Sequence, residues 1–265
     1  MTPSDRRRLP HVSGEAKVRG VTLALPVDLV SGFLPLGLEL GPQEFTNPGL
    51  HPVILFFQDM LGAQVSSALP GTTLLPAVDY HEHCVIVPFT HISRGPFKPG
   101  DPGPYYFMPK LYLDNPAATA AGLFFWGFAK EFGWIRVSGG QYSVANVAGQ
   151  PVTSFAWDMG RNEVYRSMDV YPFFEPVLRM LTQPVVSIVP ASLGPFFVLS
   201  DFVWQWGRGR PLHTAVEVDL AYIPGYPRGR YPASGWSDGM DSNQLGGFEM
   251  TGAWRLSVPY LPPNP

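Results

Sequence analysis

The sequence predicts a mainly β fold, of the α+β kind with one or two short helices, arranged as a β-sandwich or β-barrel. Three observations support this class. The chain has 28 Gly and 30 Pro among its 265 residues, and these residues mark many turns. Its apolar share of 45% is too high for a disordered chain. Short runs rich in β-branched and aromatic residues lie between the turns, as strands require.

Charge and cysteine content narrow the class of protein further. Charged residues make up 15% of the chain, against about 25% in ordinary domains, so we expect a homo-oligomer that hides part of this surface. The net charge of −3 offers no basic surface for nucleic acid. The longest apolar run, residues 117–129, is too short to span a membrane. The single cysteine, Cys84, excludes an internal disulfide framework. We therefore expect a soluble, cytoplasmic protein.

The chain is expected to form one domain. Residues 1–14 are polar and are predicted to be a flexible N-terminal segment, and residues 15–265 are predicted to be the single domain. Three arginines occupy residues 6–8, but the segment after them lacks the apolar core of a signal peptide.

Strands dominate the first half of the domain. Residues 27–34 predict a helical turn closed by Pro35. Pro88 interrupts an apolar run, which predicts an edge strand or a bulge because proline cannot donate a ladder hydrogen bond. Turn residues predict a loop over 95–104. The predicted strands are residues 17–25, 51–60, 83–90 and 105–113.

The clearest helix start is Asp114-Asn115-Pro116. Asn is a favoured N-cap and Pro suits the first helical position. The helix is predicted to end near residue 126 at Gly127, which leaves Lys130 just beyond it. A Gly/Pro/Ser-rich loop is predicted over residues 224–246. The predicted strands of this half are residues 134–138, 142–147, 152–157, 184–189, 195–204, 213–222 and 247–259.

Lys130 stands in the most aromatic stretch of the chain, FFWGFAKEFGW, residues 124–134. Burial among apolar groups can lower the pKa of a lysine by up to about 3–5 units and produce a neutral amine. Such an amine attacks a ketone, and the resulting iminium lets a β-carboxylate leave as CO2 without a metal or organic cofactor. The alternative is a lysine whose methylenes cover the aromatic rings while its ammonium reaches water or Glu131.

Two segments carry a resemblance to a known family. Residues 111–133, LYLDNPAATAAGLFFWGFAKEFG, resemble the acetoacetate decarboxylase family, which has a Tyr-Leu-Asp-Asn strand end, a small-residue helix with a glycine, and an aromatic-Pro-Lys-Lys-x-Gly segment. The first lysine of that pair forms the Schiff base and falls on Lys130. Residues 79–89, DYHEHCVIVPF, resemble the family's Tyr-x-Glu-x-x-x-x-Val-Pro strand, whose glutamate falls on Glu82. Residues 246–260 resemble its closing strand more weakly.

The resemblance implies an antiparallel, cone-like β-barrel of the acetoacetate decarboxylase type that assembles into oligomers. It implies that Lys130 and Glu82 are catalytic, and that Phe128 and Leu111 line the pocket. Arg19 is the nearest match, across a gap, to the arginine that holds the substrate carboxylate. A further acidic residue of the family has no clean match: Phe56 lies near that position, with Gln58 and Asp59 close by.

The function implied is the decarboxylation of a small β-keto acid through a lysine iminium and enamine, without a cofactor. Two alternatives stay open. An aldolase-dehydratase would use the same lysine on pyruvate or a related 2-oxo acid. A module without catalysis would bind a small hydrophobic acid, with Lys130 as its counter-charge.

Two positions depart from the family pattern. Glu131 replaces the second lysine, and Ala129 replaces the proline before the pair. A carboxylate at about 4 Å would raise the pKa of the nucleophile by about three units at an effective dielectric of 20. Neighbouring side chains of an extended segment point to opposite faces, so we expect Glu131 to face away from Lys130, into an interface.

Two other patterns receive weaker functional interpretations. His81, His83 and His91 would share one face of a strand and could bind zinc, but we expect packing roles and no metal site. Because Glu82 alternates with His81 and His83, these two histidines should point out of the barrel if Glu82 points in. Residues 235–239 fit G-x-S-x-G, but they lack the flanking strand and helix of a nucleophile elbow.

Overall fold

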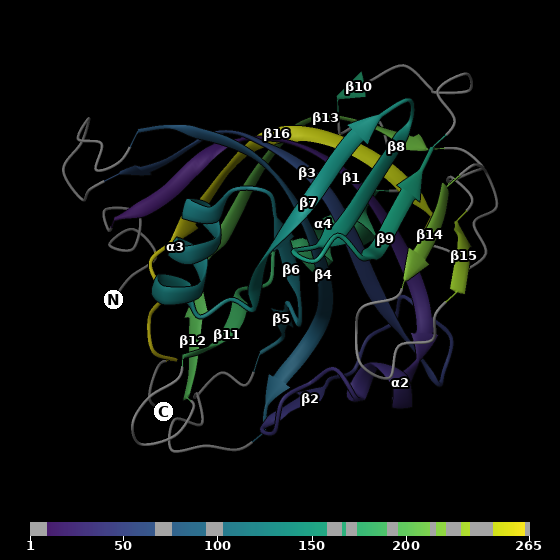
Figure 1. Ribbon diagram of the computed structural model, residues 1–265. Coiled ribbons are helices and arrows are strands. Elements are labelled where there is room, and N and C mark those ends of the chain that lie inside the picture. Colours follow the sequence, from purple (N-terminus) through teal and green to yellow (C-terminus); the bar gives the residue numbers. More distant parts are fainter. Residues whose placement is uncertain are drawn as a thin grey trace.

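The computed structural model describes residues 10–66, 76–93, 103–157, 166–167, 174–189, 196–212, 216–220, 229–233 and 246–262. In this part of the chain nearly all regular structure is one large, strongly curved sheet with three short helices (Figure 1). The prediction of a mainly β fold with few helices is therefore confirmed. No helix among the described residues is long and apolar enough to cross a membrane.

Long antiparallel strands form the centre of the sheet. Their spatial order is β16 (Gly247–Ser257), β1 (His11–Pro26), β3 (Leu50–Ser66) and β4 (Val78–Ile92). Beyond β16 lie β13 (Phe202–Leu212) and β10 (Arg166–Ser167). Beyond β4 lie β6 (Leu111–Leu113), β7 (Lys130–Ser138), β8 (Gln141–Asn146), β9 (Pro151–Ala156), β14 (Val216–Leu220) and β15 (Gly229–Ala233). A side branch from β4 contains β2 (Leu38–Leu40), β5 (Tyr105–Phe107), β11 (Val185–Val189) and β12 (Phe196–Ser200).

The sheet curls back on itself without closing among the described strands. Strand β15 is the last strand in the spatial order of the sheet. It nevertheless contacts β1, which lies in the middle of that order. The predicted antiparallel arrangement needs one correction, since β6 pairs with β7 and β5 with β11 in parallel. The first of these pairs exists because α3 (Pro116–Trp126) is a crossover between β6 and β7, as parallel neighbours require.

Several boundaries differ from the sequence-based prediction. Strand β1 begins at His11, ahead of the domain start expected at residue 15, because residues 11–14 pair with β16. Residues 105–113 form two strands, β5 and β6, and residues 195–204 contribute to β12 and β13. Strand β15 interrupts the predicted loop 224–246, whose other residues, apart from Gly246, lie outside the described part. The bulge predicted at Pro88 is confirmed by a register shift in the pairing of β4 with β5.

Both faces of the long strands are buried. One core lies against α3 and α4 (Glu175–Leu181), and it contains Phe56 and Trp126. The other lies beneath β8, β9 and α2 (Val27–Ser31), and it contains Phe57 and Tyr142. Neighbouring residues of β3 thus pack into different cores, because side chains alternate along a strand. Burial on both faces explains why residues 52–57, PVILFF, form an unbroken apolar run.

Candidate active site

Helix α3 has the ends that the sequence predicts. The Asn115 side chain accepts hydrogen bonds from the backbone N–H groups of Ala117 and Ala118, each at 3.0 Å. Pro116 occupies the first turn, and Gly127 ends the helix with a left-handed φ of 66°. The chain then enters β7, whose first residue, Lys130, pairs with Leu111 of β6. The helix ends therefore determine where Lys130 enters the sheet.

The Lys130 side chain runs past Gly122 of α3. A Cβ atom at position 122 would lie 2.3 Å from the Cδ atom of Lys130 and 2.4 Å from its Cε atom. Only glycine leaves room for this path. The side chain is 10% exposed, and its ammonium lies 5.9 Å from the ring centre of Phe128.

Lys130 forms an ion pair with Glu82 of β4. Lys130 Nζ donates to Glu82 Oε2 at 3.1 Å, and the Glu82 side chain is 6% exposed. Gln58 of β3, which pairs with Glu82 in register, donates from Nε2 to Glu82 Oε1 at 3.1 Å. The structure thus brings together the two residues predicted to be catalytic and adds Gln58.

Gln58 was not assigned a role from the sequence. Its Oε1 atom is buried without a hydrogen-bond partner. The Nε2 atom that donates to Glu82 also lies 3.5 Å from the sulfur of Cys84. The register of β3 with β4 could have identified Gln58, because it determines which residue of β3 stands opposite Glu82.

A cavity of about 230 Å³ opens beside Lys130, between α3 and the sheet. Glu82, Leu111 and Phe128 line it together with Lys130, as the resemblance implied. Burial, and then the negative charge of Glu82, raise the pKa of the Tyr80 hydroxyl, which also lines the cavity. A wider hollow of about 850 Å³ over β7, β8 and β9 contains none of these residues.

Arg19 lies on the opposite face of the sheet from this cavity. Its neighbour Val18 pairs with Gln58 and packs into the core beside α3, so Arg19 points the other way. Arg19 Nη1 donates to Asp59 at 3.1 Å, and Nε lies 2.9 Å from Glu249 Oε2 as an ion pair without hydrogen-bond geometry. Its predicted role as the holder of a substrate carboxylate at Lys130 is therefore wrong.

Comparison with known proteins supports the fold. It does not identify the activity. Neither the protein-family models nor the curated proteins include a match to this sequence. Among solved structures, an acetoacetate decarboxylase from Legionella pneumophila superposes with a TM-score of 0.62 at 14% identity, over 95% of this chain and 86% of that one. The chain has the acetoacetate decarboxylase-like fold.

Two further structures share the acetoacetate decarboxylase-like fold. The enduracididine biosynthesis enzyme MppR has a TM-score of 0.60 at 17% identity, over 96% of this chain and 88% of that one. An acetoacetate decarboxylase-like enzyme from Sphingomonas wittichii has a TM-score of 0.54 at 13% identity, over 96% and 94% of the two chains. The resemblance read from residues 79–89 and 111–133 is thus confirmed for the fold.

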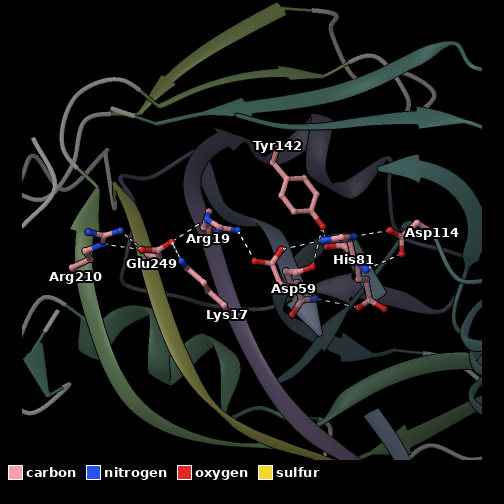
Figure 2. A network of polar contacts seen from close by, with 10 residues as sticks. Lys17, Arg19, Asp59, His81, Asp114, Tyr142, Arg210 and Glu249 are labelled. Atoms are coloured by element: carbon pink, nitrogen blue, oxygen red, sulfur yellow. Dashed lines mark hydrogen bonds and ion pairs between the residues drawn. The ribbon is translucent and has the colours of Figure 1, made fainter. Parts of the chain in front are cut away.

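The face opposite Lys130 holds a chain of ion pairs (Figure 2). It runs from Arg210 through Glu249, Arg19 and Asp59 to His81 and Asp114. The Arg19 guanidinium also lies 4.7 Å from the ring centre of Trp157. These contacts pair the charges of this face with one another.

The histidines of β4 show no metal arrangement. Among the described residues no group of three or more His, Cys, Asp or Glu side chains could hold a metal ion. His83 and Glu82 point to opposite faces, as expected, but His83 packs fully buried in the second core. Burial lowers the pKa of His83 to about 3, while the hydrogen bond to Asp114 raises the pKa of His81.

Glu131 faces away from Lys130, as expected from strand alternation. Its carboxylate pairs with the ammonium of Lys110 and is half exposed. The departure from the family's lysine pair therefore leaves Glu82 as the carboxylate that contacts Lys130. The G-x-S-x-G pattern at residues 235–239 lies outside the described residues.

Proposed function

We propose that the chain is a cofactor-independent decarboxylase of a β-keto acid, in which Lys130 forms a Schiff base with the substrate. The observation that carries the proposal is the Lys130–Glu82 pair, which is almost completely buried and stands at the edge of an apolar cavity. A buried ion pair contributes little net stability, because desolvation offsets its attraction. A reactive role explains why the protein has a buried ion pair beside a cavity that a ligand could fill.

Glu82 is the proton acceptor in this proposal. Transfer of one proton from Lys130 to Glu82 over 3.1 Å leaves a neutral amine and a carboxylic acid. The amine attacks the keto carbon, and the acid returns its proton as water leaves to form the iminium. The bond to the β-carboxylate then breaks, CO2 leaves, and the electron pair remains in an enamine. Protonation of the enamine carbon and hydrolysis release the ketone and restore Lys130.

The lining of the cavity favours decarboxylation over an aldol reaction of pyruvate. Lys130 is the only cation among the described residues that line it, since Arg19 lies on the other face. A carboxylate that persists through the reaction would remain unpaired there, whereas a carboxylate that leaves as CO2 removes its own charge. The aldolase-dehydratase alternative is supported by the structures of MppR with pyruvate and with a condensation product of pyruvate.

Borohydride trapping tests the proposal. We expect acetoacetate, followed by reduction, to leave an isopropyl group on Lys130, because CO2 is lost before the iminium is reduced. Pyruvate would leave a carboxyethyl group. Peptide mass spectrometry locates the adduct, and Lys130→Met should remove it. Lys110→Met is the matched control, because Lys110 pairs with Glu131 away from the cavity.

The outcomes separate the three functions. A stronger adduct from pyruvate than from acetoacetate would favour the aldolase-dehydratase. Folded protein that gives no adduct with either acid would contradict the Schiff base and favour the binding module, in which Lys130 only provides a charge. An adduct that survives Lys130→Met would place the chemistry on another lysine.

Self-association and a cytoplasmic location stay predictions. Phe124 and Phe125 of α3 are 78% and 70% exposed in the single chain. Large apolar side chains exposed next to each other are typical of surfaces that bind a partner. We expect light scattering of the purified protein to give a mass above that of one chain.

A further inference from the structure

The cavity at Lys130 has a polar end and an apolar end. Tyr80, Glu82 and Lys130 form the polar end, where Tyr80 and Glu82 share one face of β4. Val12, Val65 and Leu256 line the other end, where β1 pairs with β3 on one side and with β16 on the other. Along β3 the two ends are roughly 20 Å apart, at about 3.3 Å per residue. The cavity is therefore a slot that runs along the strands.

Two tryptophans keep this slot apolar. Trp126 Nε1 donates to the backbone oxygen of Ser257 at 2.8 Å, and Trp254 Nε1 donates to that of Glu15 at 3.2 Å. Both indole N–H groups are thus occupied, and the carbon atoms of the rings remain to line the slot. A ligand at this end would meet hydrocarbon surface.

Helix α3 leaves the slot open because it turns its smallest side chains toward the sheet. Ala117, Ala118, Ala121 and Gly122 all line the cavity. A cavity of about 150 Å³ is known to accommodate benzene. On that scale the present volume of about 230 Å³ accommodates about nine atoms of carbon size. Acetoacetate bound at Lys130 would extend only a single methyl group toward the apolar end.

We propose that the substrate is a β-keto acid with a straight hydrocarbon chain of several carbons beyond its keto group. This inference rests on the proposed function, because Lys130 must reach the keto carbon. The head would lie at Lys130 and Glu82, and the chain would lie between α3 and strands β1, β3 and β16. Each methylene that leaves water would increase specificity roughly fourfold.

Chain length is the first test. We expect kcat/KM, measured by CO2 release, to rise from acetoacetate to 3-oxohexanoate by at least about tenfold, from two more buried methylenes. 3-Oxooctanoate should keep or extend that gain. Values of kcat/KM that are flat or fall along the series would overturn the inference. The Schiff base would still stand if acetoacetate were trapped on Lys130.

A matched pair of helix variants tests the position of the chain. Ala118→Leu fills the slot, whereas Ala120→Leu adds the same side chain at an exposed position of α3 that does not line the cavity. We expect Ala118→Leu to lower the ratio of 3-oxooctanoate to acetoacetate kcat/KM by about tenfold or more. Ala120→Leu should keep the wild-type ratio. Equal ratios in the two variants would overturn the inference.

A binding measurement separates this inference from the proposed function. If no keto acid is trapped, calorimetry with butanoate, hexanoate and octanoate still reports on the slot. Affinity that rises with chain length and falls in Ala118→Leu would support a hydrocarbon site without the proposed chemistry. Affinity that does not depend on chain length would overturn the hydrocarbon site as well.

Discussion

Two buried glutamates, on opposite faces of one sheet, have different surroundings. Glu249 of β16 contacts three cations, with Arg19 Nε at 2.9 Å, Arg210 Nε at 2.8 Å and Lys17 Nζ at 3.4 Å. Among the described residues, Glu82 of β4 contacts one cation, Lys130, and it stands beside an apolar cavity. Both side chains are almost inaccessible to water. The two glutamates differ in the number of cations that they contact and in whether a cavity lies beside the carboxylate.

In the proposed mechanism, this difference separates a structural charge from a reactive one. A carboxylate that is surrounded by cations is stabilised as an anion and has little reason to accept a proton. A carboxylate with one partner and an apolar neighbourhood can exchange a proton with that partner, because neither ion is solvated by water. The face with Glu249 is therefore expected to govern stability, and the face with Glu82 to govern chemistry.

The largest expected effect is on activity, at Glu82. Glu82→Gln keeps the size of the side chain and removes the proton acceptor, so turnover should fall roughly 10²–10⁴-fold. Urea unfolding should show a smaller loss of stability than the matching change at Glu249, because Glu82 contacts one cation among the described residues, whereas Glu249 contacts at least three. A variant that keeps wild-type turnover would remove Glu82 from the mechanism.

The matching change on the other face should affect stability. Glu249→Gln removes a buried carboxylate that contacts Arg19, Arg210 and Lys17, and we expect the free energy of unfolding to fall by roughly 3–5 kcal/mol. The control is Glu44→Gln, whose pair with Arg179 is exposed and should contribute about 0–1 kcal/mol. Urea denaturation measures both. Equal effects of the two substitutions would contradict a structural role for the buried network.

A smaller effect is expected where α3 meets Lys130. Gly122→Ala would push the Lys130 side chain off its path, since the new Cβ atom would lie 2.3 Å from Cδ. Trapping should slow by about tenfold or more, while alanine improves helix propensity by about 1 kcal/mol. Ala120→Gly is the control, with lower stability and unchanged trapping. A wild-type trapping rate in Gly122→Ala would show that Lys130 tolerates another path.

The smallest expected effect is a pH dependence from His83. Burial lowers its pKa to about 3 in the folded chain, against 6.5 for the unfolded chain. The unfolded state therefore takes up a proton first as pH falls, and folding stability decreases between these values. From about pH 7.5 to about pH 5.5 the loss should be about 1.4 kcal/mol. Urea midpoints of wild type and His83→Gln at both pH values measure it, and identical slopes would contradict it.

Local features of the sequence were sufficient to predict the helix that positions the candidate site. Asn115, Pro116 and Gly127 determine both ends of α3 by backbone hydrogen bonding and φ angle alone. The resemblance to the acetoacetate decarboxylase family then pointed to Lys130 and Glu82, which the structure places 3.1 Å apart. Strand alternation also predicted correctly that Glu131 and His83 point away from this pair.

Long-range pairing could not be predicted in the same way. Arg19 was assigned to the site, but the residue that pairs with Gln58 on the cavity face is its neighbour, Val18. A shift of one residue moves a side chain to the other face of a sheet. Gln58 was missed for the same reason, because only the register of β3 with β4 places it against Glu82.

The sequence by itself determined where α3 begins and ends, because helix caps and turns depend on neighbours in the chain. Its resemblance to a known family selected Lys130 and Glu82 as candidates for the proposed chemistry. Tertiary structure decided which face each strand residue occupies, that Glu249 has three cations and Glu82 one, and that a slot runs beneath α3. These features depend on contacts between strands far apart in sequence. Where both faces of a strand are buried, as along much of β3, the local apolar pattern does not distinguish one face from the other.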